Sequence, residues 1–245
     1  VSGIDKKIYL GKYKIDINDS LIDIFNNIYF GKIILKKFII NEGSKITDLF
    51  SNEIIKRFCQ TANFQNECEL EGYAKPDVYL YDREIELLSI LKKSIENQMA
   101  DLNKSWNERN SKLVNFSKKE ILIIASILEK ESCANEREKI SGVIYNRLKN
   151  NMLLQMDSTT IYGLKDFNGN LKKKDLRDSS LYNTYMHKGL PPGPISNPSR
   201  NSIFAAAQPE EHDYLYFVAK DKCSHEFSTN YDDHLKAVKK YQLRQ

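Results

Sequence analysis

The sequence predicts an α+β fold in which a small mixed module is followed by a larger helical region. Three observations carry this prediction. The first sixty residues alternate strand and helix patterns, residues 83–151 contain three helical patterns, and a buried strand pattern occurs late, at 213–219. A chain of 245 residues is long enough for one large domain or two smaller ones.

The N-terminal module has a β-α-β-α order. Residues 7–17 (KIYLGKYKIDI) partly alternate apolar and polar side chains, which predicts a strand, and apolar residues recur at helical spacing between 21 and 28. Gly31 can end that helix. A β-rich run at 33–40 and a helical pattern at 41–58 complete the module, and Pro76 predicts a turn within residues 70–82.

Three helices are expected in the middle of the chain. Residues 83–109 predict a long amphipathic helix. Ser117 and Glu120 fit a capping box, and the residues that follow are apolar almost without interruption, so this second helix should be buried on nearly all sides. A third helix should begin after Asn135, with Glu138 as its capping partner.

The C-terminal third is rich in turns and polar side chains. Five of the six prolines lie between 191 and 209, and a short helix should follow Asn197-Pro198 and end before Pro209. Residues 213–219 predict a buried strand, 225–228 its partner strand, and 230–242 a terminal helix.

Composition excludes several classes of function. A net charge of +4, from 37 basic and 33 acidic residues, is too small to indicate nucleic-acid binding. The cysteines have no zinc spacing, so we predict neither a metal site nor a cofactor. Cys59 and Cys68 could form a disulfide in an oxidising compartment or remain free thiols. The longest apolar run is far shorter than the roughly 20 residues of a membrane span.

Two glutamates follow the most apolar run of the chain, in ILIIASILEKESCANER (121–137). Residues two apart on a helix point about 200° away from each other, so Glu129 and Glu131 cannot form a pair of carboxylates in one cleft. Glu131 stands one turn after two apolar residues, a setting that favours the neutral acid and suits a general acid. Glu129 is then the structural member. The structural alternative for Glu131 is a bond to a neighbouring backbone group or to an arginine, with Arg137 and Arg147 as candidates.

Six segments resemble the endolytic murein transglycosylase family, also called YceG-like, in order and spacing. They are ASILEKES, NEREKISGVIYNRL, LLQMDSTTIYGL, YNTYMHKGLPPGPISNP, DYLYFVA and HEFS. Upstream, GKYKI, INEGSKITDLF and EGYAKPDVY are similar to the family's first module and its junction, so the resemblance covers the chain from about residue 8. The chain departs from the family in lacking a proline before Glu42 and in having Ser132 where threonine is common.

The resemblance implies a domain organisation and a catalytic residue. Residues 1–65 are expected to form a LysM-like glycan-binding module, and residues 66–245 a catalytic domain with a lysozyme-like helical core and a few strands. The family's catalytic glutamate is the second of a Glu-x-Glu pair, which falls on Glu131. That residue would protonate the glycosidic oxygen and then take the proton of the sugar's own 6-hydroxyl as it attacks C1, so no second carboxylate is needed.

The polar C-terminal loops are expected to hold the sugars by hydrogen bonds and stacking. The candidates are Gln155, Asp157, Tyr182, Asn183, Thr184 and Tyr185. Each has a structural alternative: Asp157 could cap a turn, and the tyrosines could belong to the core. Pro191 and Pro192 would shape the cleft through rigid backbone. The resemblance also places His225 in the cleft, although a lone histidine is more often structural.

The implied substrate is a peptidoglycan glycan strand. Family members cleave between MurNAc and GlcNAc inside the strand, leave 1,6-anhydro-MurNAc ends and so help to set strand length; penicillin-binding protein synthases are candidate partners. They carry one N-terminal transmembrane helix, which would lie upstream of Val1, so we expect the periplasmic domain of a single-pass inner-membrane protein. Two alternatives stay open: a hydrolytic muramidase with Asp157 as base, and a non-catalytic peptidoglycan-binding scaffold.

Overall fold

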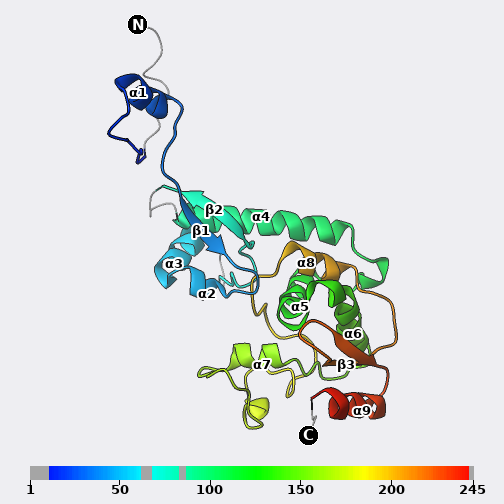
Figure 1. The fold of residues 1–245 in the computed structure, drawn as a ribbon. Helices are drawn as coiled ribbons and strands as arrows, with labels where there is room; N and C mark the ends of the chain where they lie inside the picture. The colour runs from blue at the N-terminus through cyan, green and yellow to red at the C-terminus, as the bar shows by residue number, and fades with distance from the viewer. Residues whose placement is uncertain (1–10, 62–67, 83–86, 243–245) are drawn as a thin grey trace.

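The computed structural model of the protein describes residues 11–61, 68–82 and 87–242, and Figure 1 shows their arrangement. This part of the chain is α+β, as predicted: helices surround two separate antiparallel sheets of two strands each. Among the described residues, no helix combines the length and the apolar composition that crossing a membrane requires.

The first helix, α1 (Leu21–Tyr29), extends away from the rest of the molecule (Figure 1). Ser20 caps it in a capping box with Asp23, but the helix contributes no buried residue. The strand predicted at 7–17 is wrong for its described part, residues 11–17, where one isolated bridge between Tyr13 and Ile33 forms; residues 7–10 lie outside the described ranges. Ile17 is 99% exposed, so the alternating pattern has no packing surface to stabilise a strand there.

A two-stranded sheet and two short helices form the N-terminal core. Strand β1 (Lys36–Ile40) pairs with β2 (Asp77–Tyr81), and Phe38 lies opposite Tyr79. Helices α2 (Ile46–Leu49) and α3 (Asn52–Thr61) follow β1. The N-terminal core consists of buried residues of this region and of the next helix: Ile40, Ile46, Phe50, Phe58, Leu70, Ala74, Ile90 and Leu91.

Strand β2 forms in a stretch for which the sequence predicts a turn. Pro76 directly precedes β2 and does not prevent it, because pairing begins at Asp77 and needs no N–H from the proline. A disulfide joins Cys59 to Cys68, with their Cα atoms 5.9 Å apart. Since β1 pairs with β2, the first sheet contains residues on both sides of position 65, where we predict the domain boundary.

The larger C-terminal core is helical. Its helices are α4 (Leu87–Asn107), α5 (Lys118–Glu131), α6 (Arg137–Lys149) and α8 (Arg200–Ala207). As expected, Ser117 and Glu120 form the capping box of α5, and every residue from Ile121 to Leu128 is buried. Helix α5 packs against α4, α6 and α8, which lie around it in Figure 1.

The predicted cap of α6 is wrong. Residues Ala134–Glu136 form a 3₁₀ turn, and α6 begins only at Arg137, with Glu136 as an N-cap that makes no side-chain capping bond. Asn135 is therefore inside the preceding turn. Ser199, not Asn197, caps α8, because the Ser199 hydroxyl accepts the N–H of Ser202.

The remaining elements cover the C-terminal core. Helix α7 (Asp157–Gly163) forms in the stretch expected to be turns, and 3₁₀ turns occur at Ser111–Leu113 and Asp175–Arg177. Strands β3 (Tyr216–Ala219) and β4 (His225–Ser228) pair as an antiparallel hairpin, and α9 (Tyr231–Tyr241) packs against it. A second disulfide, Cys133–Cys223, joins the segment after α5 to the turn of this hairpin.

Candidate active site

Helix α5 directs its two C-terminal glutamates into different environments. The Glu129 carboxylate accepts hydrogen bonds from the Ser199 amide at 2.8 Å, the Ser199 hydroxyl at 2.6 Å and the Ser202 hydroxyl at 2.7 Å. Its other oxygen receives Arg137 at 3.2 Å. Burial alone would raise the pKa of Glu129, but these hydrogen bonds and the arginine outweigh it, so the pKa lies below its ordinary value. Glu129 is thus a fixed anion that ties α5 to α6 and to the start of α8.

Glu131, the last residue of α5, has a different partner. Its Oε1 atom accepts both the hydroxyl of Ser158 at 2.5 Å and the amide of Ser158 at 3.2 Å. Ser158 stands in the first turn of α7, so this short helix holds one oxygen of the carboxyl group. Both hydrogen bonds from Ser158 are made to Oε1, so Oε2 is the better placed of the two oxygens to carry a reactive proton.

The environment of Glu131 favours its neutral form. Burial of the carboxyl group raises its pKa, and the charge of nearby Asp157 adds to the rise. The hydrogen bonds from Ser158 and the nearby His225 oppose this rise without cancelling it. A carboxyl group with a raised pKa at the wall of a cavity has the properties of a general acid.

A cavity of about 270 Å³ adjoins Glu131, and we call it the active-site hollow. Its walls are formed by Gly43, Lys45, Lys130, Glu131, Asp157, Ser158, Ile161, Tyr162 and Ile195. Two of these residues come from the loop after β1, and the others come from α5, α7 and the segment before α8. The hollow therefore lies where the N-terminal module meets the C-terminal core.

The loop after β1 is held against α5 and the segment before α8. The Lys130 ammonium group donates to the Gly43 carbonyl at 3.2 Å, and the amide of Gly43 donates to the carbonyl of Asn197 at 2.9 Å. The Lys45 ammonium group lies 4.8 Å from the centre of the Tyr162 ring, and the Tyr162 hydroxyl donates to Glu71 at 3.3 Å. These contacts hold Gly43, Lys45, Lys130 and Tyr162 in place in the wall of the hollow.

Of the residues that the sequence suggests for sugar binding, Asp157 shares the active-site hollow with Glu131. Its carboxylate accepts the Tyr185 hydroxyl at 2.6 Å. Tyr185 is half-buried, whereas Gln155 is exposed and receives Arg147 at 3.3 Å. The structure thus brings Asp157 and Tyr185 together beside Glu131.

Asn183 and Thr184 do not reach a site that a sugar could contact. Both are buried, and their side chains are occupied inside the protein. The Asn183 side chain accepts from Thr160 and from the Tyr185 amide and donates to two backbone carbonyls. The Thr184 hydroxyl bonds the Met156 amide and Thr159. In this structure both side chains bond α7 or the segment before it, and Asn183 also bonds the Tyr185 amide, so they have a structural role in place of the expected contact with a sugar.

The other candidates lie outside the walls of the hollow. Tyr182 packs against Tyr162 with ring centres 4.8 Å apart. It therefore supports Tyr162, which lines the hollow. Pro191 and Pro192 border a different cavity, of about 390 Å³, which Phe116 and Leu148 also line. Pro191 is buried and Pro192 exposed.

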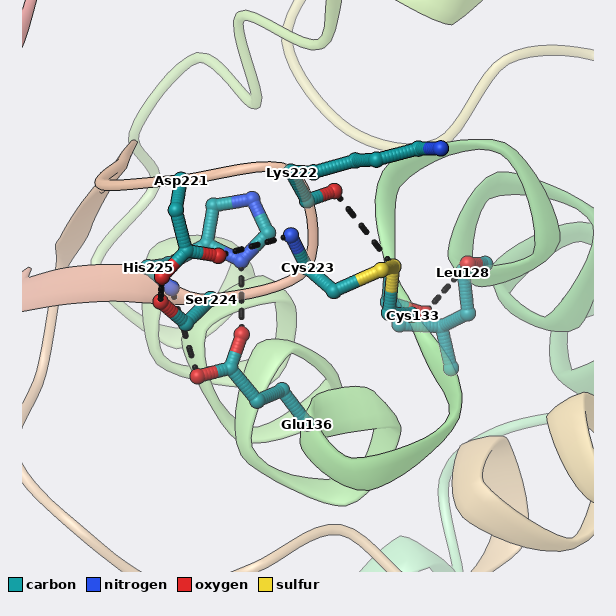
Figure 2. Close-up of a disulfide and its surroundings, with 9 residues drawn as sticks. Leu128, Cys133, Glu136, Asp221, Lys222, Cys223, Ser224 and His225 are labelled. Atoms are coloured by element: carbon teal, nitrogen blue, oxygen red, sulfur yellow. Dashed lines mark hydrogen bonds and ion pairs between the residues drawn. A yellow bond between two sulfur atoms is a disulfide. The ribbon is translucent and has the colours of Figure 1, made fainter.

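His225 begins strand β4 and is paired with Glu136. Its ring nitrogen Nδ1 lies 2.7 Å from one carboxylate oxygen of Glu136, and its amide donates to the other at 3.3 Å. Figure 2 shows this pair beside the Cys133–Cys223 disulfide. His225 is also close enough to Glu131 to act on its pKa. The histidine thus has a structural partner, Glu136, and lies near the candidate acid.

Three residues around the site are missed by sequence reasoning: Ser158, Lys45 and Glu136. The segment QMDST could have indicated Ser158, because a helix that begins at Asp157 leaves the backbone N–H groups of its first turn free to donate to a carboxylate. Nothing local indicates Lys45, which reaches the hollow only through tertiary contact. The described residues contain no group of three side chains arranged to hold a metal ion.

Comparison with known proteins gives consistent matches. The model of the YceG-like family matches residues 1–240. An endolytic murein transglycosylase of Bacillus subtilis is 36% identical over 203 residues, which are 79% of this chain and 55% of that protein. A protein of the same description from Streptococcus pneumoniae is 33% identical over 156 residues, 61% of this chain and 28% of its own length. This chain therefore spans about half of the first relative and less of the second.

A solved structure is also similar. The crystal structure of a yceG-like protein from Listeria monocytogenes superposes with a TM-score of 0.72 and is 28% identical in sequence. The match covers 95% of this chain and 85% of that one. The arrangement of elements in Figure 1 is thus one already seen in an experimental structure.

Proposed function

The chain belongs to the YceG-like family, and from this premise we propose that it is an endolytic lytic transglycosylase of peptidoglycan, with Glu131 as its catalytic acid and base. The observation that carries the proposal is the state of the Glu131 carboxyl group. It has a raised pKa, one oxygen held by Ser158, and a place in the wall of a cavity. The relatives named as murein transglycosylases support the substrate class.

In the proposed reaction, Glu131 first gives its proton to the oxygen of the β-1,4 bond between MurNAc and GlcNAc. The bond between C1 and the glycosidic oxygen breaks. The Glu131 carboxylate then removes the proton of the MurNAc 6-hydroxyl while the oxygen of that hydroxyl bonds to C1. Glu131 ends as it began, as a neutral acid, and the product is a 1,6-anhydro-MurNAc end. Because the nucleophile belongs to the substrate, its effective concentration is high when the ring is held in position.

We propose supporting roles for the neighbours of Glu131. Ser158 fixes Oε1, so that the proton resides on Oε2. The Asp157 carboxylate and the Tyr185 hydroxyl, which are 2.6 Å apart, would bind sugar hydroxyls. The Tyr162 ring would provide a face on which a sugar stacks. Gln155, Tyr182, Pro191 and Pro192 act at greater distance, on the ends of a longer bound strand or through the loops that shape the cleft.

A hydrolytic muramidase is the second candidate, and one observation favours it. Asp157 lines the same hollow as Glu131, and a second carboxylate can direct water to C1. In that reaction the product would have a reducing MurNAc end. Asp157 is already bonded to Tyr185, which makes a role in holding the substrate the simpler assignment.

The wider setting follows from the same premise. We propose that residues 1–65 act as a LysM-like glycan-binding module and that α5 belongs to a lysozyme-like core. The protein would work outside the cytoplasm, attached by a membrane helix upstream of Val1 and beside penicillin-binding protein synthases. The two disulfides support an oxidising compartment, since such bonds are rare in the cytosol.

The test is digestion of purified peptidoglycan followed by mass spectrometry of the products. We expect anhydro ends from the parent protein and a loss of about 10²–10⁴-fold in rate for Glu131→Gln, which keeps the shape of the side chain but cannot donate the proton. Glu211→Gln, an exposed change far from the hollow, is the matched control. Reducing ends in place of anhydro ends would indicate the muramidase, and binding without digestion by the parent would indicate a scaffold.

A further inference from the structure

A disulfide and the Glu136–His225 pair connect the segment after α5 to the β3–β4 hairpin. The Cys133–Cys223 disulfide links residues 90 positions apart, and its Cα atoms are 5.2 Å apart. Three residues after Cys133, Glu136 accepts the amide of His225 and pairs with its ring. Figure 2 shows the disulfide beside the Glu136–His225 pair, with Cys223 and His225 on the hairpin, Cys133 after α5 and Glu136 at the start of α6.

This doubly tied segment begins directly after the candidate acid. Glu131 is the last residue of α5, and Ser132 closes the helix by donating its amide and its hydroxyl to the Leu128 carbonyl. Cys133 follows at once. A displacement of Cys133 would therefore be transmitted to Glu131 through only one intervening residue.

The hairpin turn has little else to hold it in place. Residues 220–223 are exposed, and the hydrogen bonds of Lys220, Asp221, Cys223 and Ser224 are mostly formed with one another inside the turn. The contact of His225 with Glu136 is an ion pair only while the histidine is protonated. The disulfide is the covalent connection between this turn and the loop after α5.

We infer that the Cys133–Cys223 disulfide is a positioning device for Glu131, which holds the end of α5 and His225 in the arrangement that the reaction requires. The inference rests on the proposed function. Cys133 and Cys223 do not touch substrate; they act through the backbone of residues 131–133 and through the start of β4. The disulfide Cys59–Cys68, which lies in the N-terminal core, has no such role.

The experiment isolates one disulfide by removing the other. In the Cys59→Ser/Cys68→Ser variant, dithiothreitol can reduce only Cys133–Cys223, giving two thiols while the reagent becomes its cyclic disulfide. We expect kcat for peptidoglycan cleavage to fall between about tenfold and a hundredfold, as small misplacements of a catalytic group do, with KM within about twofold. Reoxidation should restore kcat. The variant without any cysteine should match the reduced state and ignore dithiothreitol.

A second readout does not depend on activity. Carboxyl ¹³C NMR, with the Glu131 signal identified by its loss in Glu131→Gln, follows the titration of this group in both redox states. Reduction should lower its pKa, because a displaced helix end exposes the carboxyl group. Of the other charged and titratable groups around Glu131, Lys45, Asp157 and Tyr162 are not on the tied segment, whereas Lys130 is on the end of α5 and His225, which lowers the pKa of Glu131, is on the hairpin. Burial is the largest cause of the raised pKa, so its loss should outweigh the effect of displacing His225.

The outcomes separate this inference from the proposed function. Equal kcat and an unchanged Glu131 titration in the two redox states, with circular dichroism showing a folded protein, would overturn the positioning role. The same loss of kcat on breaking Cys59–Cys68 alone would overturn its specificity. A parent protein that does not cleave peptidoglycan overturns the proposed function instead, and the NMR titration then still decides whether the disulfide positions Glu131.

Discussion

Glu129 and Glu131 are two residues apart, yet their pKa values shift in opposite directions. Burial raises the pKa of both carboxyl groups, so the difference comes from their partners. Glu129 receives three donors and an arginine on its two oxygens, so its anion is stabilised. Glu131 receives two donors on one oxygen only, so desolvation dominates and the neutral acid is favoured. The additional donors and the arginine at Glu129 thus distinguish the structural residue from the candidate acid.

The hydrogen bonds of Ser158 predict a pH effect. They stabilise the Glu131 carboxylate, so Ser158→Ala should raise the pKa of Glu131 further. An acid must be protonated to act, and kcat/KM therefore falls as the pH rises through this pKa. In Ser158→Ala this fall should move to higher pH, measured as initial cleavage rates across a pH series. Ser202→Ala, which removes a donor to Glu129, should leave the profile in place; a shift to lower pH in Ser158→Ala would contradict the assignment.

The buried ion pair of Glu129 and Arg137 predicts a large loss of stability on substitution. Glu129→Gln leaves the arginine, whose side chain is 9% exposed, without its counter-charge. Breaking such a pair costs about 3–5 kcal/mol in the free energy of unfolding, measured by urea denaturation. Because the pKa of Glu129 is lowered in the folded state, the parent's advantage should be complete above the ordinary glutamate pKa and disappear as the pH falls through the lowered value. Glu211→Gln, on the surface, should unfold like the parent.

At the scale of elements, local signals predict the presence of a helix better than the residue that caps it, and they predict contacts between distant segments poorly. The capping box of α5 forms as predicted, whereas the caps predicted for α6 at Asn135 and for α8 at Asn197 do not form. The strand expected at 7–17 depends on a partner and a surface that the described part does not offer, and β2 forms beside Pro76 because β1 supplies the pairing. Hydrogen-bond partners far along the chain decided these cases.

The candidate site shows the same limit. The sequence and the resemblance indicate Glu131 and Asp157, which the structure places in one hollow. They do not separate Tyr185, which reaches Asp157, from Asn183, whose side chain is fully occupied inside the core. Both residues belong to the polar segment YNTY, and only the backbone path of that segment determines which side chains face the hollow.

The two capping boxes predict different consequences for the same substitution. Ser117→Ala removes the cap of α5, the central helix of the C-terminal core, and should lower the free energy of unfolding by about 1 kcal/mol. Ser20→Ala removes the equivalent cap of α1, which has no buried residue, so it should fray that helix alone. Thermal unfolding and amide hydrogen exchange measure the two effects; an equal change in global stability would contradict the independence of α1.

On the scale of the whole molecule, the N-terminal and C-terminal cores meet in a polar joint built around the segment before α8. Asn197 lies at its centre: its side chain accepts the Ala74 amide and donates to the Ser44 carbonyl, both at 3.0 Å. Gln98 of α4 adds bonds to the carbonyls of Gly72 and Pro198. The joint brings the loop after β1 to the active-site hollow, so it connects the architecture to the proposed chemistry.

Asn197→Ala should therefore weaken both stability and substrate binding. The change leaves the buried Ala74 amide without its acceptor, which costs about 1–3 kcal/mol in the free energy of unfolding. It also loosens Gly43 and Lys45 in the wall of the hollow, so KM for peptidoglycan should rise more than kcat falls. Ser196→Ala is the matched control, because the neighbouring Ser196 is equally buried but bonds the Ser126 carbonyl inside the C-terminal core. Ser196→Ala should lower the free energy of unfolding by a similar amount and leave KM for peptidoglycan unchanged. A rise of KM in both variants, or in neither, would show that the joint does not shape the substrate site.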